Sequence, residues 1–247
     1  MIISEKKYYI EKKINIKKII HTSLIDWEGM IVATLYTGGC NFRCPFCYNV
    51  DLVANPNSLT SIDEDYIFKF LNERSDFLDG ICLSGGEPTI YNDLIKFLVK
   101  IKNLDMKIKL DTNGANPDSL AEIIKRGLID YIAMDIKTCL QPEKYKKIIG
   151  INDRSIVSKI KESIKLIKNS GIDYEFRTTV VPVYHDNNVI EEIARGIEGS
   201  NLYILQNFIS NERLLNNNLS YINPYSVEKM KELKNVADNY VKKCKIR

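Results

Sequence analysis

The sequence predicts an α/β protein built as a partial (β/α)6 barrel, a TIM-like arrangement of parallel strands with its site at their carboxyl ends. Short apolar runs alternate with longer amphipathic segments, which is typical of repeated β-α units. Glycine and proline separate these segments, and polar residues collect directly after the apolar runs. A chain of 247 residues can bury one large core, so we expect a single domain over residues 1–247.

The strands and helices follow from the spacing of apolar residues. Six apolar runs are predicted to be strands: 31–37, 80–84, 106–111, 129–135, 174–181 and 202–206. Amphipathic segments predict helices at 62–74, 91–103, 117–126, 154–169, 187–198 and 226–243. Ser61 with Glu64 resembles a capping box, Pro117 suits a first helical turn, and Gly127 and Gly171 suit helix ends.

Three further segments complete the predicted organisation. Residues 1–22 form an N-terminal extension that we expect to add an edge strand or a hairpin. Segment 207–225 is rich in Asn and lacks periodicity, which predicts a long loop. Residues 226–247 carry the C-terminal helix.

Composition excludes several classes of protein. The 35 Lys and Arg residues nearly balance the 32 Asp and Glu residues, and a net charge of +3 is too small to indicate binding to nucleic acid or an anionic membrane. No segment approaches the roughly 20 apolar residues of a membrane span, and no signal peptide is recognisable, so we expect a cytoplasmic protein. Both termini are basic, which indicates either ordinary solvated surface or a docking face for an acidic partner.

Three cysteines within eight residues offer three thiolates to one metal centre and no fourth. They are Cys40, Cys44 and Cys47. A structural zinc site uses four protein ligands, so three cysteines indicate a centre with one position open for chemistry. A zinc site completed by a distant Cys or His is the alternative, and His21 and His185 are the available histidines. The other cysteines stand alone: Cys82, which we expect in the core, Cys139, and Cys244, which we expect to be unpaired.

Glycine or polar residues follow all six predicted strands. In chain order they are the Cys40 loop, Gly85-Gly86-Glu87, Asp111, Asp135 with Lys137, Arg177, and Asn207. Because the carboxyl ends of the strands in a parallel barrel meet at one end, these residues should converge on one region. Taken singly, the glycines could form a plain turn and Asp135 could pair locally with Lys137. Arg177, inside an apolar strand, requires a buried anion or a ligand carboxylate.

These motifs together resemble a known superfamily. The Cys-x-x-x-Cys-x-x-Cys spacing with Phe46 before the last cysteine, followed one strand later by Gly-Gly-Glu-Pro, resembles the radical S-adenosylmethionine superfamily. Leu110-Asp-Thr-Asn-Gly114 and Asp135-Ile-Lys137 resemble its glycyl-radical enzyme activating enzymes, such as pyruvate formate-lyase activating enzyme. The stretches Ser23-Leu-Ile-Asp-Trp-Glu-Gly29 and Thr37-Gly-Gly-Cys-Asn-Phe-Arg-Cys-Pro45 are similar to those of anaerobic ribonucleotide reductase activating proteins.

The resemblance implies an anaerobic enzyme with one [4Fe–4S] cluster that reductively cleaves S-adenosylmethionine to a 5′-deoxyadenosyl radical. The three cysteines would bind three irons, and S-adenosylmethionine would chelate the fourth. The implied contacts of S-adenosylmethionine are Gly85, Gly86, Glu87 and Asp111 for the ammonium, Lys137 and Arg177 for the carboxylate, Asp135 and Asn207 for the ribose, and the main chain of Phe46 for the adenine.

The resemblance also implies two partners. A glycyl-radical enzyme would be the protein substrate, and a reduced flavodoxin or ferredoxin-type protein would be the electron donor. Tyr48 stands where many activating enzymes carry His, and Trp27-Glu28 replaces a commoner Tyr-Pro pair, which leaves the identity of the protein substrate open. The alternatives are a radical S-adenosylmethionine enzyme acting on a small molecule, for example one like 7-carboxy-7-deazaguanine synthase, and a non-catalytic metal-binding module.

Overall fold

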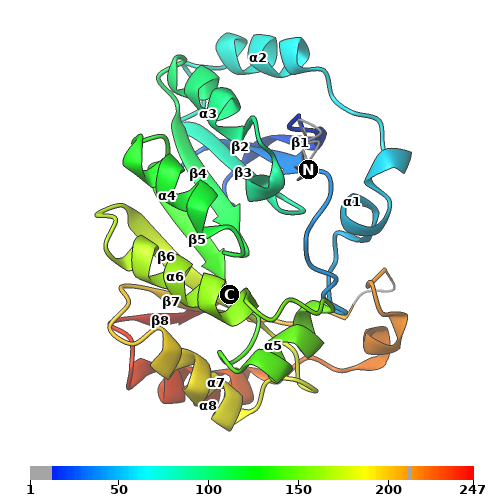
Figure 1. Ribbon diagram of the computed structural model, residues 1–247, viewed down its shortest axis with the longest axis vertical. Coiled ribbons are helices and arrows are strands. Elements are labelled where there is room, and N and C mark those ends of the chain that lie inside the picture. The colour runs from blue at the N-terminus through cyan, green and yellow to red at the C-terminus, as the bar shows by residue number, and fades with distance from the viewer. Residues whose placement is uncertain (1–12, 211–212) are drawn as a thin grey trace, which may run out of the picture.

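The six predicted strands form the centre of one curved sheet, which is a partial barrel in the computed structural model (Figure 1). The structure describes residues 13–210 and 213–247, and in that part the sheet has eight strands in sequence order. They are β1 (Ile16–Ser23), β2 (Val32–Thr37), β3 (Gly80–Gly85), β4 (Lys107–Thr112), β5 (Tyr131–Asp135), β6 (Asp173–Val180), β7 (Tyr203–Asn207) and β8 (Cys244–Ile246). All neighbours from β2 to β8 run parallel, so the predicted α/β barrel is confirmed.

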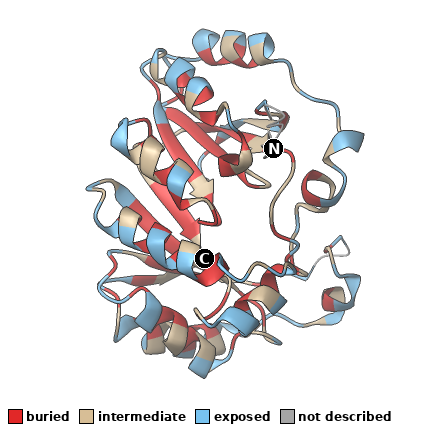
Figure 2. Ribbon diagram, viewed as in Figure 1, coloured by how far each residue is buried: buried red, intermediate tan, exposed pale blue. Residues whose placement is uncertain are grey.

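Helices cover the convex side of the sheet (Figure 1). The described helices are α1 (Val50–Ala54), α2 (Glu64–Glu73), α3 (Leu94–Lys102), α4 (Pro117–Lys125), α5 (Pro142–Ile149), α6 (Ile156–Lys168), α7 (Asn187–Gly196) and α8 (Val227–Asp238), with 3-10 turns at Pro56–Ser58, Pro88–Ile90 and Asn217–Tyr221. The strands and the inward faces of the helices are buried, while the outward faces are exposed (Figure 2). This division explains why apolar periodicity located most of these elements.

The two ends of the sheet differ from the predicted organisation. β1 pairs antiparallel with β2, with Ile16 opposite Thr37, which confirms an added edge strand; residues 1–12 lie outside the described part. The prediction of a helix over 226–243 is wrong at its end, because α8 stops at Asp238 and β8 then pairs with β7. Cys244 is accordingly buried in a strand, with Tyr203 as its partner in the ladder.

Helix boundaries follow local signals, with one exception. Pro117 is the first residue of α4, and Gly127 and Gly171 adopt positive φ angles of 63° and 73° beyond α4 and α6. The capping box predicted at Ser61 is wrong. Asp63 is the N-cap of α2, because its carboxylate accepts hydrogen bonds from the first-turn amides, whereas Ser61 accepts a hydrogen bond from a lysine on β1. No helix in the described ranges is long and apolar enough to cross a membrane.

Candidate active site

A cavity of about 450 Å³ opens at the carboxyl ends of the strands. It is lined by every predicted site residue except Asn207, namely Cys40, Cys44, Phe46, Cys47, Gly85, Gly86, Glu87, Asp111, Asp135, Lys137 and Arg177. A volume of several hundred Å³ suits a ligand the size of a nucleoside. The parallel strands therefore bring together residues that are far apart in the sequence.

The three cysteines lie on the loop of residues 38–49, which we call the cysteine loop. Cys44 is buried, Cys40 and Cys47 are half-buried, and all six cysteines of the chain are free thiols. Burial raises the pKa of Cys40 to about 11 and that of Cys44 to about 12, so a metal must displace protons to bind there. The described residues contain no group of three or more His, Cys, Asp or Glu side chains that could hold a metal ion. An iron–sulfur cubane is a different case, because each thiolate binds its own iron.

Neither histidine lines the cavity. His21 lies on β1, with its ring centroid 4.8 Å from that of Phe70. His185 is completely buried, and its Nδ1 accepts a hydrogen bond of 3.0 Å from the amide of Val181. Its Nε2 must therefore carry the proton and donate to the carbonyl of Lys137, also at 3.0 Å. Burial lowers the pKa of His185 to about 4, so the ring is neutral. Because both of its nitrogens are hydrogen-bonded to the backbone, neither is available as a fourth metal ligand.

Two glycines bring the loop after β3 against the cysteine loop. The amide of Gly86 donates to the carbonyl of Thr37 and that of Glu87 to the carbonyl of Gly39, both at 2.9 Å. A Cβ atom at Gly86 would lie 1.8 Å from the carbonyl oxygen of Gly39, and Gly85 adopts a φ of 112°. The glycines are required because two backbones touch, a reason that the sequence alone did not indicate.

Glu87 lines the cavity, but its carboxylate is held by donors of the protein itself. Its carboxylate is buried and accepts four hydrogen bonds: from the amide and hydroxyl of Thr89 at 3.1 and 2.6 Å, the hydroxyl of Thr112 at 2.8 Å, and the amide of Asn113 at 2.6 Å. Burial raises the pKa of Glu87. These four hydrogen bonds use most of the accepting capacity of the carboxylate, and little is left for the ligand ammonium that we expected it to bind. The carboxylate mainly connects the loop after β3 to the end of β4.

Asn113 is a functional candidate that the sequence reasoning did not select. Its side-chain amide donates to the side-chain oxygen Oδ1 of Asn41 at 2.8 Å and lies 3.8 Å from the sulfur of Cys40. The amide of Phe42 also donates to that sulfur, at 3.3 Å. Hydrogen bonds to cluster thiolates tune reduction potential. The signal was available in the sequence, because Asn113 belongs to the Asp-Thr-Asn-Gly turn after β4.

A row of alternating charges lines the same cavity as the three cysteines. Asp135 bonds Lys137 and Arg177, both at 2.8 Å, and Arg177 reaches Asp111 at 3.2 Å. Burial opposes ionisation of both acids, but the cations outweigh it and hold the pKa of Asp111 and of Asp135 below their usual values. One oxygen of Asp111 is buried without a hydrogen bond, although the ammonium of Lys109 lies 3.3 Å away. The local ion pair weighed for Asp135 and Lys137 is therefore present.

Asn207 does not point into the cavity as predicted. Its side chain donates to the carbonyl of Tyr225 at 2.8 Å, and Gln206 lines the cavity instead. Successive residues of a strand face opposite sides, so a displacement of one residue along β7 exchanges the two side chains. The sequence reasoning also missed other polar residues in the wall, which include Asp26, Tyr36, Ser84 and Thr179.

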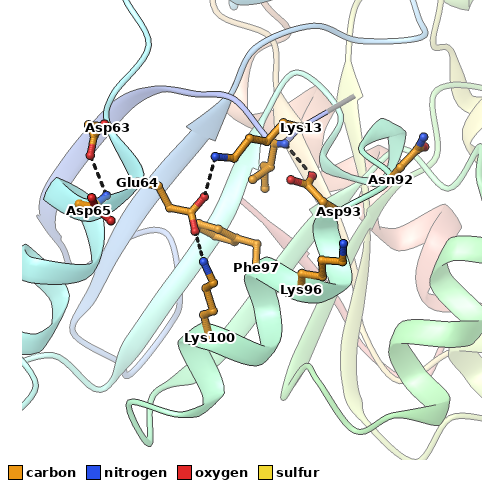
Figure 3. Close-up of a pocket in the computed structure, with 10 residues that line it drawn as sticks. Lys13, Asp63, Glu64, Asp65, Asn92, Asp93, Lys96, Phe97 and Lys100 are labelled. Carbon is orange, nitrogen blue, oxygen red and sulfur yellow. Dashed lines mark hydrogen bonds and ion pairs between the residues drawn. The ribbon is translucent and has the colours of Figure 1, made fainter. Parts of the chain in front are cut away.

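A second, larger hollow of about 700 Å³ lies outside the barrel, between the residues before β1 and the starts of α2 and α3 (Figure 3). Glu64 bridges Lys13 and Lys100 across it, and Asp93 accepts a hydrogen bond of 2.6 Å from the amide of Ile14 (Figure 3). These pairings hold the two helices to the edge of the sheet. The hollow shares no residue with the cysteine cavity.

Comparisons with known proteins show which family this chain is similar to. The family model described as Radical SAM superfamily matches residues 34–195. A protein of Methanocaldococcus jannaschii, provisionally named a glycyl-radical enzyme activating enzyme, is 34% identical over 77% of this chain and 78% of its own length. A protein of Methanococcus vannielii, provisionally named a GTP 3′,8-cyclase, is 34% identical over 52% of this chain and 42% of its own.

Among solved structures, Streptococcus suis SuiB bound to S-adenosylmethionine has the same fold. It superposes with a TM-score of 0.64 at 16% identity, and the comparison covers 85% of this chain. This chain spans about half of SuiB, 48% of its length. Membership of this family implies an iron–sulfur cluster and S-adenosylmethionine as cofactors. Because the family model matches more than half of the chain, the chain belongs to the radical S-adenosylmethionine superfamily.

Proposed function

We propose that this protein is a glycyl-radical enzyme activating enzyme that abstracts a hydrogen atom from a backbone glycine of a partner enzyme. The observation that carries the proposal is that one cavity contains both the three cysteines and a row of paired charges. The similarity to the Methanocaldococcus jannaschii protein supports it, because that similarity extends over most of both chains.

The cavity has groups that suit both cofactors. Cys40, Cys44 and Cys47 would bind three irons of one [4Fe–4S] cluster and leave the fourth iron to S-adenosylmethionine. Asp111 lines the cavity, and its carboxylate charge suits the ammonium of that cofactor, although Lys109 and Arg177 already lie 3.3 and 3.2 Å from its two oxygens. Each oxygen of Asp135 accepts one bond from a cation and has capacity for a second, which suits a ribose hydroxyl.

The remaining contacts divide between side chains and backbone. Lys137 and Arg177 would face the carboxylate of S-adenosylmethionine, and the backbone of Gly85, Gly86 and Phe46 would meet its ammonium and its adenine. When bound, the cluster and S-adenosylmethionine would together supply the radical chemistry that removes a hydrogen atom from the substrate. The chain itself would hold the sulfonium in the cavity that contains the cysteines and the paired charges.

The charges of the cavity favour a neutral substrate over a nucleoside triphosphate. Among the described residues that line it, the cations are Lys137 and Arg177, and both are paired with carboxylates. A triphosphate requires unpaired cations or a metal ion. A backbone glycine carries no charge, so it suits this cavity better than the substrate named for the cyclase. The similarity to that cyclase also covers only about half of this chain.

Anaerobic reconstitution tests the proposal in two steps. The protein, loaded with iron and sulfide and given dithionite and S-adenosylmethionine, should release 5′-deoxyadenosine. Addition of a glycyl-radical enzyme encoded beside it should then give the electron-resonance doublet of a glycyl radical. Absence of 5′-deoxyadenosine would refute radical chemistry altogether. Its release with no glycyl radical on any encoded partner, but with turnover of a metabolite, would favour a small-molecule enzyme.

A further inference from the structure

The side chain of Asn113 is held in one orientation by the turn that contains it. Asn113 is buried and lies between β4 and α4. Its side-chain oxygen accepts a hydrogen bond of 2.9 Å from the amide of Ala115, and its backbone amide donates to the carboxylate of Glu87 at 2.6 Å. Because the oxygen faces the amide of Ala115, the NH2 group of the side chain faces the cysteine loop.

The two hydrogens of this NH2 group have two acceptors in the cysteine loop. One is the side-chain oxygen of Asn41 at 2.8 Å, and the other is the sulfur of Cys40 at 3.8 Å, a longer distance that suits the larger sulfur atom. A thiolate is a stronger acceptor than a thiol because it is charged, so this second hydrogen bond should strengthen when Cys40 is ionised. Asn113 is therefore a fixed donor directed at a thiolate.

The three cysteine sulfurs differ in the hydrogen bonds that they accept. Cys40 accepts two, one from the amide of Phe42 at 3.3 Å and one from Asn113. Cys47 accepts one, from a backbone amide of its own loop, and no described residue donates to the sulfur of Cys44. In the described part of the chain, Asn113 is thus the one side chain that donates to a cysteine sulfur of the site.

We propose that Asn113 is a positioning residue that raises the reduction potential of the iron–sulfur cluster through the sulfur of Cys40. The inference rests on the cluster that membership of the superfamily implies, and not on the proposed protein substrate. A hydrogen bond to a cluster sulfur stabilises the reduced form more than the oxidised form, because the reduced form carries more negative charge. Loss of this donor should therefore make the cluster harder to reduce.

Two substitutions at position 113 remove the donor in the full chain. Asn113→Ser keeps an oxygen that can accept from the amide of Ala115, but it has no NH2 group to reach Cys40. After anaerobic reconstitution, a redox titration followed by electron resonance, without S-adenosylmethionine, should give a more negative midpoint. At a fixed potential the ratio of reduced to oxidised cluster should fall about tenfold, which is a shift of about 59 mV for a one-electron couple. Asn113→Asp places an anion beside the sulfur and should shift the midpoint further in the same direction.

A matched control lies three residues further along the same turn. Asn116 is half-buried, and its NH2 group donates to the carbonyl and the hydroxyl of Thr89 at 3.0 and 3.1 Å, which are not part of the cysteine loop. Asn116→Ser should leave the midpoint at the wild-type value. An equal shift in Asn113→Ser and Asn116→Ser, or no shift in Asn113→Ser, would overturn the assignment.

Iron content separates this role from a purely structural one. If Asn113 only supported the cysteine loop, Asn113→Ser would load less iron, but the cluster that does form would keep the wild-type midpoint, and that result would also overturn the assignment. A wild-type protein that assembles no cluster would overturn it together with the proposed function. The expected shift in a protein that releases no 5′-deoxyadenosine would support the role of Asn113 and refute the proposed function alone.

Discussion

Among single residues, two buried cysteines, Cys44 and Cys82, differ in their surroundings. Cys44 lines the cavity, whereas Cys82 is fully buried on β3 against Trp27 and Val32. We expect Cys44→Ala to abolish the visible absorbance of the reconstituted cluster, because two thiolates remain where three are needed. Cys82→Ala should retain that absorbance and lose only stability, by about 1 kcal/mol, because a small core side chain is shortened.

The measurement for this pair is iron content and absorbance after anaerobic reconstitution, together with chemical unfolding of both variants. Loss of the cluster in Cys82→Ala to the same extent as in Cys44→Ala would mean that the ligands are wrongly assigned. Retention of a full cluster in Cys44→Ala would have the same meaning.

His185 makes stability depend on pH. Its pKa is about 4 in the folded protein against 6.5 in the unfolded chain, so between these values the unfolded state binds more protons. The free energy of unfolding should therefore fall as the pH is lowered from 6.5 to 4, by about 3 kcal/mol from this residue. His185→Gln cannot bind that proton and should show a flatter profile. Chemical unfolding of both proteins at several pH values measures the difference, and parallel profiles would contradict the prediction.

At the scale of one element, the loop after β3 requires glycine at position 86. Gly86→Ala places a methyl group against the carbonyl oxygen of Gly39, which cannot move without shifting the cysteine loop. We expect a loss of about 1–3 kcal/mol in the free energy of unfolding and reduced iron loading. The control is Gly196→Ala at the end of α7, where the nearest atom, at 2.9 Å, belongs to the flexible side chain of Leu140.

Urea unfolding and iron content compare these two alanine variants. A Gly86→Ala protein that unfolds and loads iron like Gly196→Ala would show that the two backbones can separate at little cost.

Helices and strands with a strong apolar pattern could be predicted from the sequence, whereas short elements without such a pattern could not. All six predicted strands, β2 to β7, lie within two residues of their predicted limits, because each is a buried run between turn residues. α5 and β8 were missed. α5 is short and rich in lysine, although Pro142 at its start and Gly150 beyond its end were usable signals. β8 has only three residues, and its pairing with β7 is visible only in the folded sheet.

Some residues of the candidate site could also be predicted from the sequence, and others could not. The convergence of Asp111, Asp135 and Arg177 followed from the geometry of parallel strands, which requires no knowledge of side-chain partners. The place of Glu87 depends on donors from the next strand, and the choice between Gln206 and Asn207 depends on strand register. Neither can be read from local sequence, because both are set by contacts between distant segments.

At the scale of the whole molecule, ion pairs connect the first turn of the barrel to its last strand. Glu28, between β1 and β2, lies 2.7 Å from Lys245 of β8 and 3.7 Å from Arg247. Arg247 also makes two hydrogen bonds, of 2.9 and 3.0 Å, with the buried carboxylate of Glu175 on β6. Glu175 in turn lies 3.9 Å from Arg177. The edge of the barrel and the charged wall of the cavity thus belong to one network.

The pairing of Arg247 with Glu175 in this network predicts that their contributions to stability are coupled. Arg247→Ala leaves Glu175, whose side chain is 2% exposed, without its principal cation, and removal of one partner of a buried pair costs more than the pair contributes. We expect the free energy of unfolding to fall by about 2 kcal/mol, because Arg247 is partly exposed and Arg177 remains nearby. Glu175→Gln in the Arg247→Ala background removes the uncompensated charge, and should therefore recover part of the loss. Chemical unfolding of the wild type, both single variants and the double variant measures the coupling, and a double variant whose losses simply add would show that Glu175 does not depend on Arg247.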